Sequence, residues 1–249
     1  MHRFCLEDSP LVIFDDLAAM HYRQTTYVAL NVHERCRDYK NPNAGYMSLL
    51  DTILGEILKI FKDEGVEANS EDDLMRRLNI RQVTYQELFK DRTDMVRQVV
   101  LHDMREQEKR DQQMLQQTAN PVEEIFMVLQ QGIKDLKELN PVYISDLQEH
   151  YPAVWQLVLD HLNTYNYHLD LNIINKGILQ GYFRKDINLQ LVIKILLEQF
   201  HMLLNPAIFP PERYNLSEVF RSVFLYYVRG LCTEQGSKLA EEYFSKNSL

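Results

Sequence analysis

The sequence predicts an all-α protein with a small N-terminal three-helix domain followed by a larger helical domain. From Met47 onward, apolar residues recur at the spacing of one helix face. Gly, Pro, Asn and Ser punctuate these stretches at intervals typical of helix ends, and no alternating strand-rich run competes with them. The chain has 249 residues and is 45% apolar, which is enough to bury a substantial core.

Residues 1–46 differ from the rest because they have no helical stripe. Short strand-like runs cover residues 11–14 and 27–32, and the turn-rich stretch at 41–45 marks a boundary. We therefore expect three parts: an N-terminal extension at 1–46, a first domain at 47–95 and a second domain at 96–249.

The first domain is delimited by helix-end signals. The apolar stripe from Met47 to Phe61 is followed by Gly65, a typical C-terminal cap. Ser70 precedes three acidic residues, as expected for an N-cap at the positive end of a helix dipole. A short helix follows, and a new helix begins near Met95.

Further along the chain, the pattern predicts six more helical stretches. Residues 95–117 form a long, increasingly polar helix, and Asn120-Pro121 begins the next one, which runs over 122–139. Residues 143–179 carry many aromatic groups until Gly177 and Gly181 break the run. The strongly apolar stretches 189–204 and 219–231 follow, and 238–244 adds a last short helix.

Composition and motifs exclude several classes of protein. A net charge of -9 argues against non-specific binding to nucleic acid, and no stretch reaches the ~20 apolar residues of a membrane helix. The three cysteines are far apart, and acids stand where a secretory signal needs apolar residues, so we expect a cytoplasmic protein. No phosphate loop, nucleophile elbow or metalloprotease motif is present, which argues against an enzyme, and no cofactor is predicted.

Residues 57–95 have the order of a helix-turn-helix unit. In such units the third helix places its first residues in the major groove of DNA, and the inner positions are apolar. The expected interior consists of Leu74, Leu78, Ile80, Val83 and Phe89. The expected DNA-facing residues are Arg81, Gln82, Thr84 and Tyr85, whose side chains suit base edges and phosphates. The alternative for these four is ordinary surface, and for Arg76 and Arg77 a solvated helix face is favoured.

This order of features resembles the N-terminal domain of the tetracycline-repressor (TetR) family, with the match covering Met47 to about Val99. Gly65, Ser70 and Phe89 occupy the family's cap and closing aromatic positions, and Arg92 stands where the family has a phosphate-contacting Lys. The resemblance therefore implies that Arg92 binds a DNA phosphate. Val83, Gln86 and Leu88 depart from the family's small residue and aromatic pair, which leaves a degenerate unit without DNA binding as an alternative.

The resemblance also implies a function. Family members are dimeric transcriptional repressors that bind a palindromic operator and are released by a small effector. They commonly begin just before the first helix, which favours Met47 as the natural start and residues 1–46 as a start-site artefact; the alternative is an arm that contacts DNA or a partner. The rival function is a dimeric ligand-binding or scaffolding protein.

The dimer and the effector are expected in the second domain. The stretches 189–204 and 216–232 exceed what a small bundle can cover, which indicates a homodimer interface, with a wholly intrachain core as the alternative. The resemblance implies an effector pocket in the aromatic segment, with candidates Tyr143, Trp155, His161, Tyr165 and His201. A filled aromatic core is the alternative. His161, Tyr165 and His168 share a helix face, but no carboxylate or Cys completes a metal site, so no metal is predicted.

Overall fold

The computed structural model describes the backbone of residues 44–247 and the side chains of residues 49–245. The chain divides after Leu49 into two units, and the second unit, residues 50–249, contains nearly all of the described residues. The N-terminal extension, with the strand-like runs predicted at 11–14 and 27–32, lies outside the described residues. The all-α prediction is confirmed for 44–247, where the only β-type pairing is an isolated bridge between Phe183 and Cys232.

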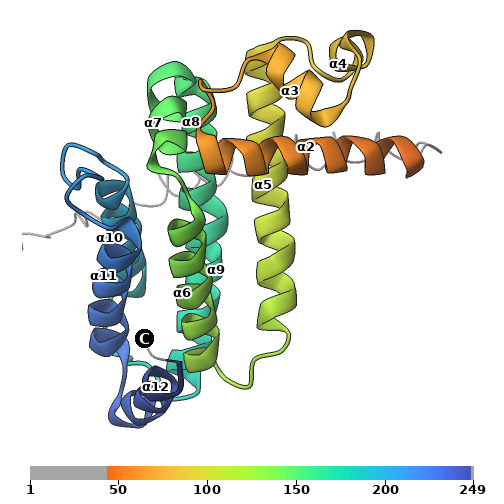
Figure 1. Ribbon diagram of the computed structural model, residues 1–249. Coiled ribbons are helices and arrows are strands. Elements are labelled where there is room, and N and C mark those ends of the chain that lie inside the picture. The colour runs from red at the N-terminus through yellow and green to blue at the C-terminus, as the bar shows by residue number, and fades with distance from the viewer. Residues whose placement is uncertain (1–43, 248–249) are drawn as a thin grey trace, which may run out of the picture. The chain divides into compact units, whose positions relative to one another are not determined.

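Three helices form the N-terminal end of the described chain: α2 (Ala44–Glu64), α3 (Glu71–Leu78) and α4 (Gln82–Leu88) (Figure 1). The first begins at Ala44, slightly before the predicted start. Gly65 ends it with φ of 91°, a conformation that favours glycine. The Ser70 side chain accepts a hydrogen bond from the Asp73 N–H at 3.1 Å, which confirms the predicted N-cap.

The rest of the chain forms a helical bundle. Its helices are α5 (Arg92–Leu115), α6 (Pro121–Glu138), α7 (Pro141–His150), α8 (Pro152–His161), α9 (Tyr167–Leu179), α10 (Leu189–Leu203), α11 (Leu216–Leu231) and α12 (Glu234–Asn247). A π-helical turn, Leu162–Asn166, joins α8 to α9. Among residues 44–247, no helix has both the length and the apolar character that a membrane crossing requires.

The aromatic segment 143–179 is divided differently from the prediction. Pro152 begins a new helix there, and Gly177 lies inside α9 without breaking it. A Cβ at Gly177 would come within 2.0 Å of the Phe183 ring, so the small residue allows this ring to pack against the helix. Gly181, with φ of 79°, does follow the end of α9 as expected.

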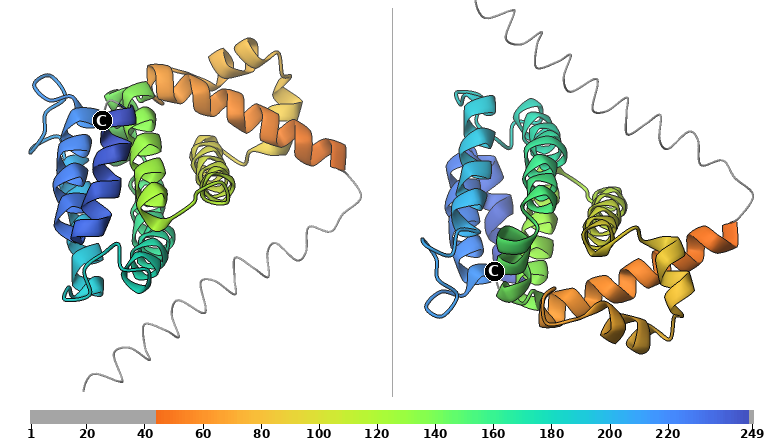
Figure 2. Two further views of the ribbon diagram at one scale, coloured as in Figure 1. Left: turned by 90° about the horizontal axis from the view of Figure 1, so that it is seen from below. Right: turned by 90° about the horizontal axis from the view of Figure 1, so that it is seen from above.

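Two hydrophobic cores hold the second unit together. One joins α2–α5 to α7 and α8 and includes Leu54, Phe61 and Met95. The other joins α6 to α9–α12 and includes Ile125 and Phe224. Figure 2 shows α10 and α11 on one side of α6 and α9, with α5 on the opposite side. Helices α5, α7 and α8 all contribute to the first of these cores.

Candidate functional site

The start of α4 presents a small exposed face. Arg81, Gln82 and Val83 are exposed, and Gln86 is exposed one turn later. Arg81 is the N-cap residue, and its side chain makes no capping hydrogen bond. Val83 is 64% exposed, which corrects its predicted place in the interior of the unit. Thr84 is half-buried. Of the four exposed residues, Arg81, Gln82 and Gln86 are polar.

Tyr85 does not belong to this face, which corrects the prediction that it contacts DNA. It is buried, and its ring packs edge-on against Phe89 with ring centroids 5.1 Å apart. Burial and the nearby Glu71 carboxylate raise the pKa of the Tyr85 hydroxyl. The helix period explains the error, because Tyr85 and Leu88 are three residues apart and share the inner face of α4.

Arg92 is also engaged within the protein, in contrast to the predicted phosphate contact. Its Nε donates to the Tyr151 hydroxyl at 2.9 Å, and its guanidinium donates to the Val66 carbonyl at 2.8 Å. Tyr151 in turn donates to the Glu67 carboxylate at 2.7 Å, and this hydrogen bond lowers the pKa of Glu67. Arg92 therefore joins the start of α5 to the α2–α3 turn and to the start of α8.

Asp146 on α7 forms a second link to the same turn. Its Oδ2 accepts the backbone N–H groups of Val66 at 2.6 Å and Glu67 at 2.9 Å. The carboxylate lies against Gly65, where a Cβ would approach Asp146 Oδ2 to 2.9 Å and Val142 Cγ1 to 2.8 Å. Gly65 is therefore required both for its positive φ and for this close approach.

Asn140 forms a third link. Its backbone N–H donates to the Lys62 carbonyl and its side-chain amide to the Asp63 carbonyl, each at 2.9 Å. These carbonyls belong to the last turn of α2, where helix carbonyls have no partner within the helix. The α7–α8 pair is thus attached to the end of α2 and to the turn after it.

Two arginines of α3 are paired with acids. Arg77 forms a bidentate pair with Glu64, with both distances 2.7 Å, and Arg76 contacts Asp73. This agrees with the favoured interpretation of both as surface residues. Arg81 and Lys90 remain as exposed basic residues near α4.

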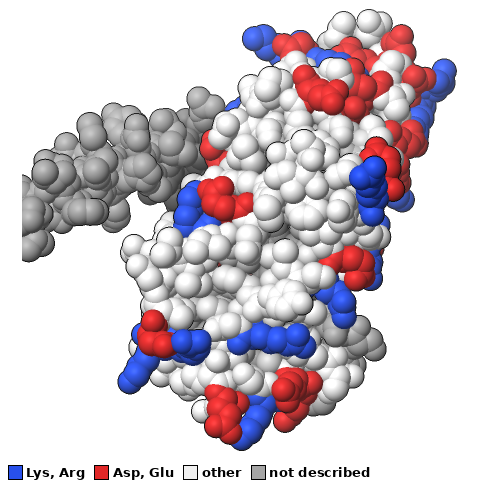
Figure 3. Space-filling model, turned by 90° about the vertical axis from the view of Figure 1, so that its left-hand side faces the viewer, with Lys and Arg blue, Asp and Glu red and all other residues white. Residues whose placement is uncertain are grey.

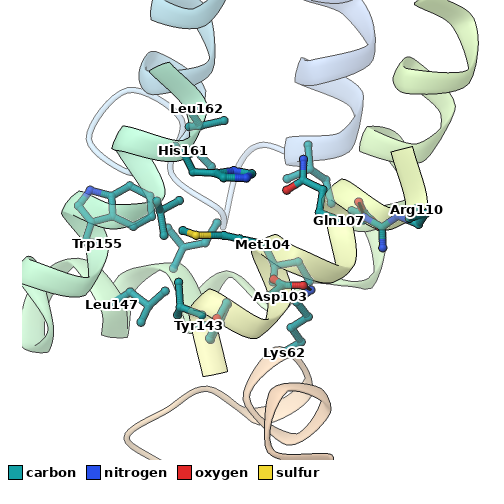
Figure 4. Close-up of a pocket in the computed structure, with 17 residues that line it drawn as sticks. Lys62, Asp103, Met104, Gln107, Arg110, Tyr143, Leu147, Trp155, His161 and Leu162 are labelled. Atoms are coloured by element: carbon teal, nitrogen blue, oxygen red, sulfur yellow. Dashed lines mark hydrogen bonds and ion pairs between the residues drawn. The ribbon is translucent and has the colours of Figure 1, made fainter. Parts of the chain in front are cut away.

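A pocket of about 240 Å³ lies between α5, α6, α7 and α8, next to the end of α2 (Figure 4). Its walls are mainly apolar and include Met104, Leu147 and Trp155. In Figure 4 the Gln107 amide and the His161 ring face each other across it. The helices that line the pocket include α7 and α8, which also hold the α2–α3 turn.

Three of the five predicted effector residues line this pocket: Tyr143, Trp155 and His161. The other two predicted residues, Tyr165 and His201, do not line it. The Tyr165 ring stacks on the His161 ring with centroids 5.0 Å apart, and its hydroxyl donates to Asp111. His201 lies on α10 and contacts Glu198 on its own helix. Among the described residues, no group of three His, Cys, Asp or Glu side chains comes together as for a metal.

The wall contributed by α5 was not predicted from the sequence. This wall contains Val100, Asp103, Met104, Gln107 and Arg110. These residues recur at spacings of three and four, which is the signature of one helix face. Because the face mixes polar and apolar groups, it was interpreted only as the surface of a polar helix.

The charges of the pocket wall are paired inside the protein. Lys62 Nζ lies 2.8 Å from Asp103 Oδ1, and Arg110 lies 2.9 Å from Asp135 Oδ2. His161 Nε2 lies 3.1 Å from the Glu108 carboxylate. The two cations and two carboxylates of the wall therefore balance.

The outer surface of α10 and α11 exposes large apolar side chains. Leu191 is 54% exposed, Ile195 47% and Tyr226 76%. An open groove runs between the two helices and is lined by Val192, Val223 and Tyr226. Figure 3 shows that the middle of this face carries few charged groups. Exposed apolar patches of this kind are typical of protein interfaces.

Solved structures of transcriptional regulators have the same fold. A TetR-family regulator from Cytophaga hutchinsonii has a TM-score of 0.60 and 14% identity, covering 78% of this chain and 100% of that chain. A transcriptional regulator from Saccharomonospora viridis in complex with choline has a TM-score of 0.60 and 13% identity, covering 76% and 100%. The regulator FadR from Bacillus subtilis in complex with stearoyl-CoA has a TM-score of 0.55 and 16% identity, covering 72% of this chain and 97% of that chain.

No protein-family model and no curated protein matches the sequence. The chain has the fold of TetR-family regulators.

Proposed function

We propose that the protein is a ligand-responsive transcriptional regulator, a repressor that binds a palindromic operator as a homodimer and is released by a small effector in the pocket beside α5. The observation that carries this proposal is the double role of residues 140–161. Tyr143, Leu147 and Trp155 line the pocket, while Asp146 and Tyr151, on the same helix pair, hold the α2–α3 turn.

This arrangement supports a route from effector to DNA. A ligand that shifts α7 or α8 changes the position of groups that bond directly to the helix-turn-helix unit. The two states then differ in their affinity for the ligand and for the operator, and this difference couples the two sites. Two of the similar structures are complexes, one with choline and one with stearoyl-CoA, which favours a ligand-responsive regulator.

The DNA contact in this proposal differs from the one predicted from sequence in two residues, because Tyr85 and Arg92 are replaced by Val83 and Gln86. It consists of Arg81, Gln82, Thr84 and, in addition, Val83 and Gln86 on the exposed face of α4. Arg and Gln side chains suit bidentate hydrogen bonds to guanine and adenine, and the Val83 methyl groups suit contact with a thymine methyl. Tyr85 packs on the opposite, inner face of α4.

The proposed dimer uses the exposed apolar face of α10 and α11. A two-fold axis through this face would present two copies of α4 to successive half-sites of a palindrome, spaced about 34 Å apart. The exposed Leu191, Ile195 and Tyr226 would then be covered by the partner.

Selection of binding sites from random duplex DNA, at two salt concentrations, tests the function. We expect an enriched palindrome whose affinity falls as salt rises, because bound phosphates release counterions. Arg81→Ala should weaken binding about ten-fold or more, since a good base contact contributes ~1–3 kcal/mol. Arg213→Ala, an exposed arginine of the α10–α11 loop, is the matched control and should leave binding unchanged.

The rival function is a dimeric ligand-binding or scaffolding protein with a degenerate helix-turn-helix unit. The acids Glu71, Asp72 and Asp73 at the start of α3 favour this rival, since they would repel phosphate. Selection that yields no enriched palindrome and no salt-dependent affinity would replace the repressor proposal with the rival.

A further inference from the structure

The chemistry of the pocket wall restricts the kind of effector it can accept. The wall has two features that do not follow from the fold: its charges are already paired, and two uncharged polar side chains are left without partners. The inference below rests on the pocket being the effector site, as proposed above.

The paired charges disfavour a charged ligand. Lys62 lies against Asp103, and Arg110 lies against Asp135, although Arg110 Nε has no hydrogen-bond partner among the described residues. Each charge of the wall is therefore already balanced, and a ligand carboxylate or ammonium would add an uncompensated charge. It would either enter without a partner or break an existing pair. Both outcomes carry the cost of removing a charge from water without compensation.

The uncharged polar groups favour a hydrogen-bonding ligand. The Tyr143 hydroxyl and the Gln107 amide both line the pocket, and neither side chain has a hydrogen-bond partner among the described residues. A ligand that fills the pocket would shut these two groups off from water, and a ligand without a hydrogen-bonding group would leave them without a partner, which carries a cost. One or two hydroxyl or carbonyl oxygens on the ligand would meet these groups.

The volume limits the size of the ligand. A cavity of about 150 Å³ holds benzene, and this pocket measures about 240 Å³. It therefore accommodates a single ring with a compact apolar substituent. Trp155, Met104 and the aliphatic side chains of the wall supply a surface suited to such a body.

We propose that the pocket binds an uncharged, mainly apolar molecule the size of a substituted benzene ring, whose hydroxyl or carbonyl group hydrogen-bonds with Gln107 or Tyr143. This assigns a chemical class to the effector. It also makes these two side chains the groups that determine specificity.

Three probes with one body and three head groups test the proposal: 4-tert-butylphenol, 4-tert-butylbenzoate and 4-tert-butylbenzylammonium. Trp155 is the only tryptophan of the chain and lines the pocket, so its fluorescence reports binding to the full-length protein at neutral pH. We expect the uncharged phenol to bind at least ten-fold more tightly than either ion. Equal or tighter binding of an ion, or no binding of the phenol, would overturn the proposal.

Variants separate this specificity from general packing. Tyr143→Phe and Gln107→Leu should each weaken binding of the phenol about three- to ten-fold, as expected for one lost hydrogen bond. Gln113→Leu, an exposed position on the same helix, is the matched control and should leave the affinity unchanged. An unchanged affinity in both pocket variants would exclude them as specificity residues.

A charge variant gives a result that loss of stability cannot mimic. Asp103→Asn leaves Lys62 without its partner at the pocket wall, and we expect the benzoate to bind at least five-fold more tightly than in the original protein. No gain would mean that the ion pair does not control ligand charge.

Operator binding provides the independent readout. If the benzoate is the tightest probe and releases the operator, the ligand class is wrong while the regulator function stands. If the phenol binds and no operator is found, the ligand class stands while the regulator function fails.

Discussion

Replacement of Asp146 by alanine tests the attachment of the helix-turn-helix unit to the pocket helices. In the structure a single carboxylate oxygen accepts two backbone N–H groups, at 2.6 and 2.9 Å, and the Asp146 side chain is 8% exposed. Val66 is completely buried, so its N–H would have no access to water after the substitution.

The expected loss of stability follows from these contacts. Hydrogen bonds to a charged group contribute ~1.5–3 kcal/mol each, and buried donors left without a partner carry a similar cost. Alanine recovers ~0.5 kcal/mol because it is the better helix former. We therefore expect Asp146→Ala to lower the free energy of unfolding by about 3 kcal/mol. Asp146→Asn, which keeps an acceptor but loses the charge, should cost about half as much.

Urea unfolding at a fixed protein concentration measures this change, and amide hydrogen exchange at Val66 and Glu67 localises it. Glu149→Ala, an exposed acid on the same helix, is the matched control and should change stability by less than ~0.5 kcal/mol. A loss below ~1 kcal/mol for Asp146→Ala, with both amides still protected, would refute the view that this carboxylate holds the turn.

Three other predictions concern separate parts of the molecule. Arg92→Ala should lower the free energy of unfolding by ~1.5–3 kcal/mol, because it removes donors to Tyr151 and to the Val66 carbonyl; weaker DNA binding at unchanged stability would instead support a phosphate contact. Tyr226→Glu should turn the dimer into a monomer in light scattering, and Lys238→Glu on α12 should not, while a dimer that survives the first change would place the interface elsewhere. Burial, with the nearby Asp111, raises the pKa of Asp170 to about 7. The folded protein then holds this proton more tightly than the unfolded chain, so the contribution of Asp170 to stability is fully present below about pH 4 and is lost as pH rises to about 7. Asp170→Asn should remove this part of the pH dependence, and an identical pH profile in both proteins would contradict it.

Much of the fold is predictable from residue types alone. Gly65 and Ser70 mark helix ends because a positive φ and an N-cap hydrogen bond are local requirements. Asn120 accepts the Glu123 N–H at 3.0 Å at the predicted start of α6, for the same reason. The apolar stripes of the long helices are equally local, since they depend only on the helix period.

The candidate site is less predictable because its residues are chosen by packing. Tyr85 and Arg92 have side chains that suit DNA, and nothing local distinguishes them from Arg81. Tyr85 is buried because the inner face of α4 lies against Phe89, and Arg92 is engaged because Tyr151 lies beside it. Tyr151 is 59 residues away in sequence, so no local pattern could reveal this contact.

The pocket also contains some residues that the sequence predicts and others that only packing selects. Tyr143, Trp155 and His161 were predicted from their residue types, while Gln107 was not, because a glutamine on a polar helix normally faces water. The sequence alone determined the helices, their ends and the presence of excess apolar surface on α10 and α11, since these follow from local backbone preference and periodicity. Only the tertiary structure decided which polar side chains are free and which are paired, because hydrogen bonds and ion pairs between distant segments depend on how the helices meet.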